Sequence, residues 1–193
     1  MRNNPTHEEK YAKEILEKYV YLKTHFSNAD QPDIQSQNPS IGIEHCLITT
    51  PTSQMQEKMS DYIEQNEMNL SEASEYQDHR FHQSKFLICA NDNGKVLGLF
   101  SFPQYSFIQM LENVLTKKYA DLNSQKYHSF SRYELFLTLH RDWMSSSDYP
   151  QSLKLIKEFN SKYHLNFKRI YILKTSSLVL FENDSYKEIE IKE

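Results

Sequence analysis

The stretch "QPDIQSQNPSIGIEHCLITT", residues 31–50, places an aspartate after a proline and a glutamate inside an apolar run. Residues 41–48 have the composition of a strand, and the proline restricts residues 32–35 to an extended arm or a short strand. Because side chains alternate along a strand, Glu44 and Cys46 share one face. An unpaired carboxylate is costly in a covered sheet. Glu44 therefore needs a cation, a hydrogen-bond network or a metal as its partner.

Asp33, on the extended arm, is the nearest acidic residue that a short turn brings beside Glu44. Two converging carboxylates form a good Mg²⁺ site, since this ion prefers oxygen ligands and keeps several waters. An ion held in this way activates water and stabilises a phosphodiester under attack. The pair therefore favours metal-dependent hydrolysis. The alternative is that Asp33 caps a turn and Glu44 makes an ordinary salt bridge.

Hydrophobic periodicity predicts helices and strands along the rest of the chain. Thr6 and Glu9 have the spacing of a capping box in front of a first helix, residues 8–23. Further helices are expected over residues 52–68, 106–124 and 149–164, and strands over residues 133–140, 167–175 and 177–184, with residues 185–193 as an edge strand or a frayed end. This order predicts an α/β fold, with α+β as the alternative, built on a single mixed β-sheet flanked by helices.

The segment between the second and third expected helices has a different character. Residues 69–83 are polar and predict a loop, and "NDNG", residues 91–94, predicts the turn of a hairpin with strands over about residues 85–90 and 96–102. A chain of 193 residues has the length of one ordinary domain. We therefore expect a single domain over residues 1–193, with a polar loop and hairpin insert at about residues 66–102.

Composition excludes several classes of protein. A net charge of -4 argues against a protein that coats nucleic acid through bulk charge, and the three glycines form no phosphate-binding loop. Two cysteines and the lack of an apolar run of ~18 residues predict a cytoplasmic protein without a membrane partner. Basic and aromatic residues mix over residues 116–132 and 157–169, as on solvated helix faces or on surfaces that contact nucleic acid.

The arrangement of the chain resembles the restriction-endonuclease-like, or PD-(D/E)XK, nuclease superfamily. "QPDIQ", residues 31–35, is similar to the Pro-Asp arm of that family, and "GIEHC", residues 42–46, is similar to its acidic strand. The resemblance implies a restriction-endonuclease-like core in which Asp33 and Glu44 are catalytic and hold Mg²⁺ or Mn²⁺. It also implies hydrolysis of DNA or RNA and, by analogy with many relatives, a homodimer.

The chain departs from the family pattern at the lysine expected two residues after the glutamate, where Cys46 stands. A thiol cannot supply the positive charge of an ammonium group. Either the protein is inactive or the cation comes from elsewhere. Lys118 follows Leu111 and Leu115 on one stripe of the helix over residues 106–124, so it resembles the relocated catalytic lysine of other members. The alternative is a lysine whose stem lies along the edge of the core.

Members of this family also often carry an acidic residue on the first helix, and Glu8, Glu9 and Glu14 are equal candidates. Three interpretations therefore stand side by side. The first is a metal-dependent nuclease that uses Asp33, Glu44 and Lys118. The second is a catalytically inactive nuclease fold that acts as a binding module, for instance in mobile elements or phage defence. The third is an unrelated α/β protein in which Asp33 and Glu44 never meet.

Overall fold

The chain forms two compact units. The computed structural model describes residues 4–38, 40–49, 51–80, 86–100, 106–124, 129–139 and 144–192. Unit 1 consists of Met1–Ile48 and Phe107–Glu193, and unit 2 of Thr49–Ser106. Unit 2 contains the expected insert together with the helix that precedes it. The expectation of a single domain stays a prediction.

Among its described residues, unit 1 has one mixed sheet of seven strands in the order β1-β2-β3-β6-β7-β8-β9. Neighbouring strands β3, β6 and β7 are parallel, and the outer strands pair antiparallel. The strands are β1 (Ser27–Asn28), β2 (Ile34–Gln37), β3 (Ser40–Ile48), β6 (Arg132–Leu139), β7 (Phe167–Leu173), β8 (Ser177–Glu182) and β9 (Ser185–Glu190). The expected α/β fold with a mixed sheet flanked by helices is confirmed, and β9 adds an edge strand to it.

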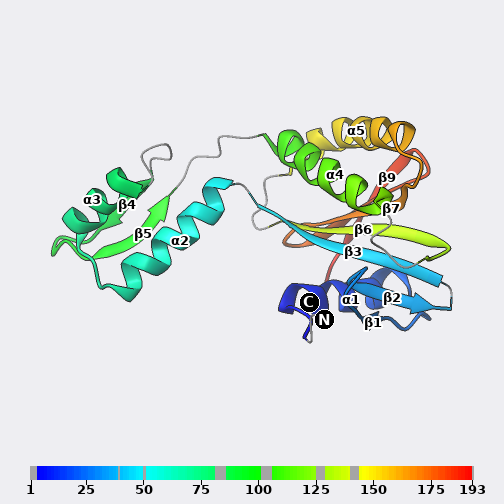
Figure 1. Ribbon diagram of the computed structural model, residues 1–193, viewed down its shortest axis with the longest axis horizontal. Coiled ribbons are helices and arrows are strands. Elements are labelled where there is room, and N and C mark those ends of the chain that lie inside the picture. Colours follow the sequence, from blue (N-terminus) through cyan, green and yellow to red (C-terminus); the bar gives the residue numbers. More distant parts are fainter. Residues whose placement is uncertain are drawn as a thin grey trace. The chain divides into compact units, whose positions relative to one another are not determined.

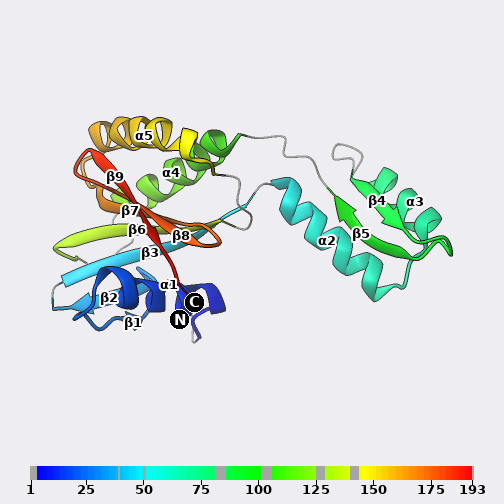
Figure 2. The ribbon, with the colours of Figure 1, turned by 180° about the vertical axis from the view of Figure 1, so that it is seen from behind.

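Helices cover both faces of this sheet (Figures 1 and 2). Helices α4 (Phe107–Asn123) and α5 (Tyr149–Lys162) pack on one face, and α1 (His7–Ile15) packs on the other. Side chains of β6 alternate between the two faces of the sheet, so this strand contributes to the hydrophobic core on each face. Leu135 and Leu137 belong to the core beneath α4, whereas Phe136 belongs to the core beneath α1.

The first helix begins at the expected capping box and ends earlier than expected. Thr6 Oγ1 accepts a hydrogen bond from Glu9 N at 3.2 Å, and Glu9 Oε2 accepts one from Thr6 N at 2.8 Å. After α1 the chain makes a π-helical turn, Leu16–Val20, and leaves the helix at Tyr21. The prediction that the helix continues to residue 23 is wrong. Tyr21 instead takes part in a network of hydrogen bonds around a buried carboxylate of the sheet.

Glu134 is the centre of that network. Its side chain is fully buried and accepts hydrogen bonds from the hydroxyl groups of Tyr21, at 2.5 Å, and Tyr171, at 2.8 Å. Arg132 Nε lies 2.8 Å from the same carboxylate, and the guanidinium groups of Arg132 and Arg169 both donate to the Tyr21 hydroxyl. Burial raises the pKa of Glu134, and these donors oppose the shift. The network ties the end of the first helix to β6 and β7.

Unit 2 consists of α2 (Pro51–Gln65), α3 (Leu70–Arg80) and a separate two-stranded sheet of β4 (Leu87–Ala90) and β5 (Val96–Phe100). Its small core joins Met59 and Ile63 of α2, Ala73 of α3, and Leu99 of β5. The predicted hairpin is confirmed within the described residues. Lys85, Ser101 and Phe102, also expected in its strands, lie outside them.

The prediction of a loop over residues 69–83 is wrong, because α3 occupies most of this segment. Asn69 caps the helix: its Oδ1 accepts hydrogen bonds from Ser71 N at 2.9 Å and Glu72 N at 3.1 Å. Glu72 Oε2 accepts in return from Asn69 N at 2.9 Å. Ala73 is the one residue of α3 that is fully buried among those described, so the helix has almost no apolar stripe. A polar helix of this kind has no periodic signal in the sequence.

Replacing Tyr21 with phenylalanine tests the network. Tyr21→Phe removes a donor to buried Glu134 and an acceptor for two arginines, so we expect the free energy of unfolding to fall by about 1–3 kcal/mol. Urea denaturation followed by circular dichroism measures this change. Tyr186→Phe is the matched control, because Tyr186 is 42% exposed. Equal stability of the Tyr21→Phe variant and the wild type would contradict a stabilising network.

Candidate functional site

Antiparallel pairing places Asp33 beside Glu44. In the register of β2 and β3, Ile34 stands opposite Ile43, and Asp33 and Glu44 directly adjoin this last pair. Asp33 Oδ2 accepts a hydrogen bond from the backbone N–H of His45 at 2.9 Å. Asp33 is 8% exposed and Glu44 is 9% exposed. Asp33 is therefore close enough to Glu44 for the charge of Glu44 to raise its pKa. The interpretation as an unrelated α/β protein stays a prediction.

Gly42 lets the arm lie this close to β3. A Cβ atom at this position would be 2.6 Å from Pro32 Cγ and 3.0 Å from Phe130 Cδ2. The first distance is shorter than any ordinary contact, and a proline ring cannot rotate away as a flexible side chain does. Pro32 directly precedes Asp33, so the missing side chain at Gly42 determines where the aspartate lies.

Lys118 reaches the same cluster from α4. Its Nζ lies 2.5 Å from Glu44 Oε1, and the two side chains are 13% and 12% exposed. As expected, Lys118 continues the inward stripe of α4 that contains Leu111 and Leu115, both fully buried. The structure thus brings together Glu44 and Lys118 in direct contact, with Asp33 adjacent to Glu44.

The charges of this cluster are unbalanced. Burial raises the pKa of Asp33 to about 7, and the negative charge of Glu44 adds to the shift. Burial opposes the charged form of Lys118, but Glu44 raises its pKa above the ordinary value. Lys118 is therefore a fixed positive charge at neutral pH and not a general base. Glu44 Oε2 is buried and has no hydrogen-bond partner among the described residues, so one carboxylate oxygen is left for another cation.

The structure distinguishes the three acids of the first helix. Glu9 is 4% exposed, whereas Glu8 and Glu14 are exposed. The charge of Glu9 is also among those that raise the pKa of Asp33. Glu9 is therefore the buried acid of the first helix beside Asp33, whereas Glu8 is exposed and interacts with His45. The sequence contained one signal that sets Glu9 apart, its capping-box spacing from Thr6, but that signal reports a helix start and not a site.

Cys46 occupies the position where the family pattern has a lysine. It lies on β3 and packs beside the core beneath α4. Burial raises the pKa of the Cys46 thiol, so the group is neutral at physiological pH and a poor nucleophile. Cys46 therefore contributes neither a charge nor a thiolate, and Lys118 is the cation of the cluster.

A divalent cation fits these residues in part. Asp33 and Glu44 supply carboxylate oxygens, one of them without a partner, and Mg²⁺ is often held by one or two carboxylates and several waters. Within the described ranges, no group of three or more His, Cys, Asp or Glu side chains is arranged to hold a metal ion. A two-carboxylate site with open coordination positions is thus the arrangement that these residues allow.

Comparisons with known proteins leave the family open. No protein-family model, no curated protein and no solved structure matches the chain. The resemblance to PD-(D/E)XK nucleases therefore rests on the residues described above. None of the helices in the part of the chain that the structure describes is long and apolar enough to cross a membrane.

The raised pKa of Asp33 makes stability depend on pH. The carboxyl has an ordinary pKa of 3.8 and a folded-state pKa of about 7, so the folded state binds the proton more tightly. The free energy of unfolding therefore falls as pH rises through this window. Because Asp33→Asn removes the charge, we expect this variant to gain stability over wild type at about pH 8 and to lose that advantage near pH 4.

Urea denaturation across this pH range measures the effect. Asp30→Asn is the matched control, since Asp30 is exposed and lies three residues upstream. We expect the control to follow the wild type at every pH. An advantage of Asp33→Asn that is the same at both ends of the range would show that Asp33 does not titrate in this window.

Adding one methyl group at Gly42 tests the close approach of the arm. Gly42→Ala places a carbon within 2.6 Å of the Pro32 ring, so the arm or β3 must shift. We expect a loss of about 1–3 kcal/mol in the free energy of unfolding, as for other overpacked sites. Thermal denaturation measures it, and an unchanged midpoint would mean that the arm is not fixed against β3.

Proposed function

We propose that the protein is a metal-dependent nuclease, a phosphodiesterase that acts on DNA or RNA, with Asp33 and Glu44 as metal ligands and Lys118 as the catalytic cation. One observation carries this proposal. Side chains from three separate segments, the arm before β2, β3 and α4, come together in one cluster. Lys118 Nζ lies 2.5 Å from Glu44 Oε1, and Asp33 accepts a hydrogen bond from the backbone of His45, next to Glu44.

Each residue has a distinct part in the proposed reaction. Asp33 and Glu44 would hold Mg²⁺ or Mn²⁺, and the bound ion would supply a Lewis acid for the phosphodiester. The ammonium of Lys118 stabilises the negative charge that develops on the phosphate, because it is already charged at neutral pH and oriented by Glu44. Glu9 adds a further negative charge near Asp33 and so favours binding of a cation.

Charge distribution supports a nucleic-acid substrate for unit 1. Unit 2 has eight acidic residues against four basic ones, so it holds the whole net charge of -4, and the remaining residues are balanced with 18 of each sign. Unit 1 therefore has no net charge to repel phosphates.

We place the activity in the cytoplasm, since Cys46 and Cys89 are both free thiols. We also expect a homodimer, by analogy with the nuclease family.

A second function is favoured by the same ion pair. Lys118 already compensates the charge of Glu44, both side chains are mostly buried, and a buried pair can be purely structural. In this alternative, the protein has an inactive nuclease fold and acts as a binding module in a mobile-element or phage-defence setting. It then binds nucleic acid or protein without cleaving a phosphodiester.

Cleavage assays with purified protein distinguish the proposed nuclease from the inactive binding module. We expect the wild type to nick or degrade DNA or RNA with Mg²⁺ or Mn²⁺ and to stop when the metal is chelated. Glu44→Gln and Asp33→Asn should lower the rate by at least about a hundredfold, because each removes a ligand charge. Glu190→Ala removes an exposed carboxylate on β9 and should leave the rate unchanged.

Folding and metal binding need separate readouts, because loss of Glu44 leaves Lys118 buried and unpaired. Circular dichroism establishes which variants fold. Titration of Mn²⁺ followed by electron paramagnetic resonance should show binding to the wild type and weaker binding to Asp33→Asn. Equal activity of wild type and Glu44→Gln on every substrate contradicts the nuclease. Metal binding without cleavage favours the binding module.

A further inference from the structure

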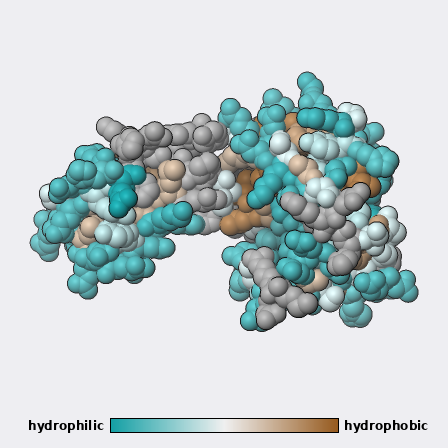
Figure 3. Space-filling view, in the orientation of Figure 1, coloured by the Kyte–Doolittle hydropathy of each residue, from teal (hydrophilic) through white to brown (hydrophobic). Residues whose placement is uncertain are grey.

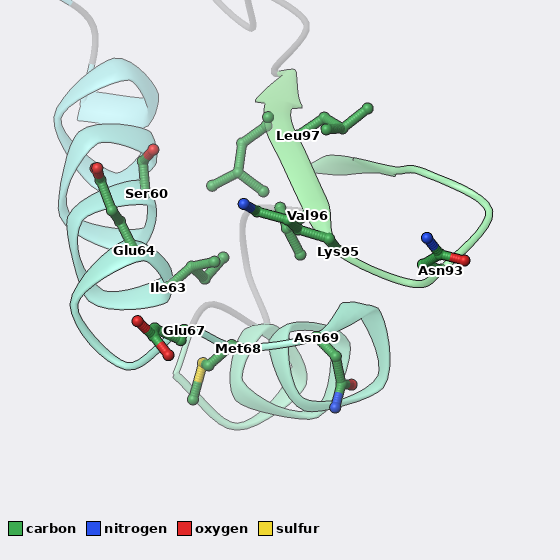
Figure 4. Close-up of a pocket in the computed structure, with 12 residues that line it drawn as sticks. Ser60, Ile63, Glu64, Glu67, Met68, Asn69, Asn93, Lys95, Val96 and Leu97 are labelled. Atoms are coloured by element: carbon green, nitrogen blue, oxygen red, sulfur yellow. The ribbon is translucent and has the colours of Figure 1, made fainter.

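Unit 2 contains a cavity of about 770 Å³ between α2 and β5 (Figure 4). This volume lies within the range of about 300–1,000 Å³ that is usual for ligand sites. Ile63, Val96 and Leu99 form its apolar part, and Glu64, Glu67 and Lys95 bring charges to it. Figure 4 shows Lys95, which directly precedes β5, extending toward α2, while Leu97 points away from that helix. We call this cavity the α2–β5 groove.

The outer edge of β5 faces the groove. Helix α2 lies on the side of β5 opposite to β4 (Figures 1 and 2). Two contacts anchor the ends of this edge: Leu99 O accepts a hydrogen bond from Gln56 Nε2 at 2.5 Å, and Asn69 forms an isolated bridge with Lys95. Between these anchors, the strand that pairs with residues 96–98 among the described residues is β4, on the opposite edge, where a bulge or irregularity shifts the register. An unpaired edge of this kind is a template for an added strand.

The charges of the groove select a basic occupant. Glu64 and Glu67 are exposed, and neither carboxylate makes an ion pair with another described residue. Unit 2 as a whole has a net charge of -4. A nucleic acid would be repelled by this charge, whereas lysine or arginine side chains would be attracted. Among the described residues that line the groove, Lys95 is the one lysine against these two glutamates, so the groove keeps an excess of negative charge.

Apolar side chains beside the groove provide a second kind of contact. Leu97 on β5, which lines the groove, is 68% exposed. On the face drawn in Figure 3, the surface of unit 2 is otherwise mostly hydrophilic. Side chains of an added strand alternate between the two faces of the sheet, so every second residue would contact this apolar surface.

We propose that the α2–β5 groove binds an extended basic peptide segment of a partner protein, added as a third strand along β5. Main-chain groups of the peptide pair with residues 96–98. Its aliphatic side chains contact Ile63, Val96 and Leu97, and its lysine or arginine side chains pair with Glu64 and Glu67. This inference is independent of the proposed nuclease activity, because every residue that it uses lies in unit 2.

Selection of peptides tests the proposal. The full chain is used as bait for a phage-displayed library of random peptides of about seven residues, which matches a short added strand. We expect enrichment of sequences that combine lysine or arginine with β-branched residues. Fluorescence polarisation then measures the affinity of synthetic copies. The absence of any enriched sequence would overturn the proposal.

Charge reversal identifies the binding surface. The double variant Glu64→Lys and Glu67→Lys should weaken binding by at least about tenfold, because it replaces attraction with repulsion. Asp61→Lys makes the same change on an exposed residue of α2 that does not line the groove, and it should bind as the wild type does. Equal binding by the double variant and the wild type would place the peptide elsewhere.

Modified peptides test strand addition without altering the protein. Methylation of alternate backbone nitrogens removes the donors that pair with β5, so in one of the two registers it should abolish binding. Unchanged binding in both registers would contradict an added strand.

Sedimentation of the full chain tests whether a second copy of the chain occupies the groove in place of a peptide. A dimer that the double variant dissociates would show that a second copy fills the groove, and would overturn the assignment to a partner peptide.

Discussion

The structure of unit 1 depends on a mostly buried carboxylate in the sheet that needs a positively charged partner. Glu44 lies in the middle of β3, mostly buried, and its charge is compensated by Lys118 of α4 at 2.5 Å. Removing one partner from a buried ion pair costs about 3–5 kcal/mol, which is a large part of the stability of an ordinary domain. The pair therefore fixes the rotation of α4 over the sheet. A lysine on an otherwise apolar stripe has its physical reason in this contact.

Stability alone does not explain the rest of the cluster. Glu44 needs one cation and has Lys118, yet two further buried acids, Asp33 and Glu9, lie near it. Burial raises the pKa of Asp33 to about 7, and the charges of Glu44 and Glu9 add to the shift. Glu134, on the other face of the sheet, shows what a purely structural carboxylate looks like: both of its oxygens accept hydrogen bonds. Glu44 Oε2 has no such partner in the part of the chain that the structure describes. This excess of acids and unmet acceptors is the pattern expected where a fold has been shaped for a ligand.

Local patterns made part of this cluster predictable. Alternation placed Glu44 on one face of β3, helical spacing placed Lys118 on an inward stripe, and a short turn was enough to bring Asp33 beside Glu44. Contacts between distant segments had no such signal. The phenol of Tyr21 bonds to Glu134, 113 positions away, and no period links the two. Helix α3 was missed for another reason, since its signal was the spacing of Asn69 and Glu72 at its start and not apolar periodicity.

The order of the chain gives the Glu44–Lys118 pair one more consequence. Unit 2 begins directly after β3 and ends directly before α4, so the chain leaves unit 1 from the strand of Glu44 and returns to it at the helix of Lys118. The pair therefore closes the loop, 74 positions long, that contains unit 2. Closing a loop costs little more entropy when the loop is longer, so an inserted unit is tolerated as long as this contact holds. A ligand of unit 2 can change the cluster only if it binds with different affinities to different conformations of the two connecting segments. The coupling is reciprocal, so a ligand bound at the cluster would then change the affinity of unit 2 by the same free energy.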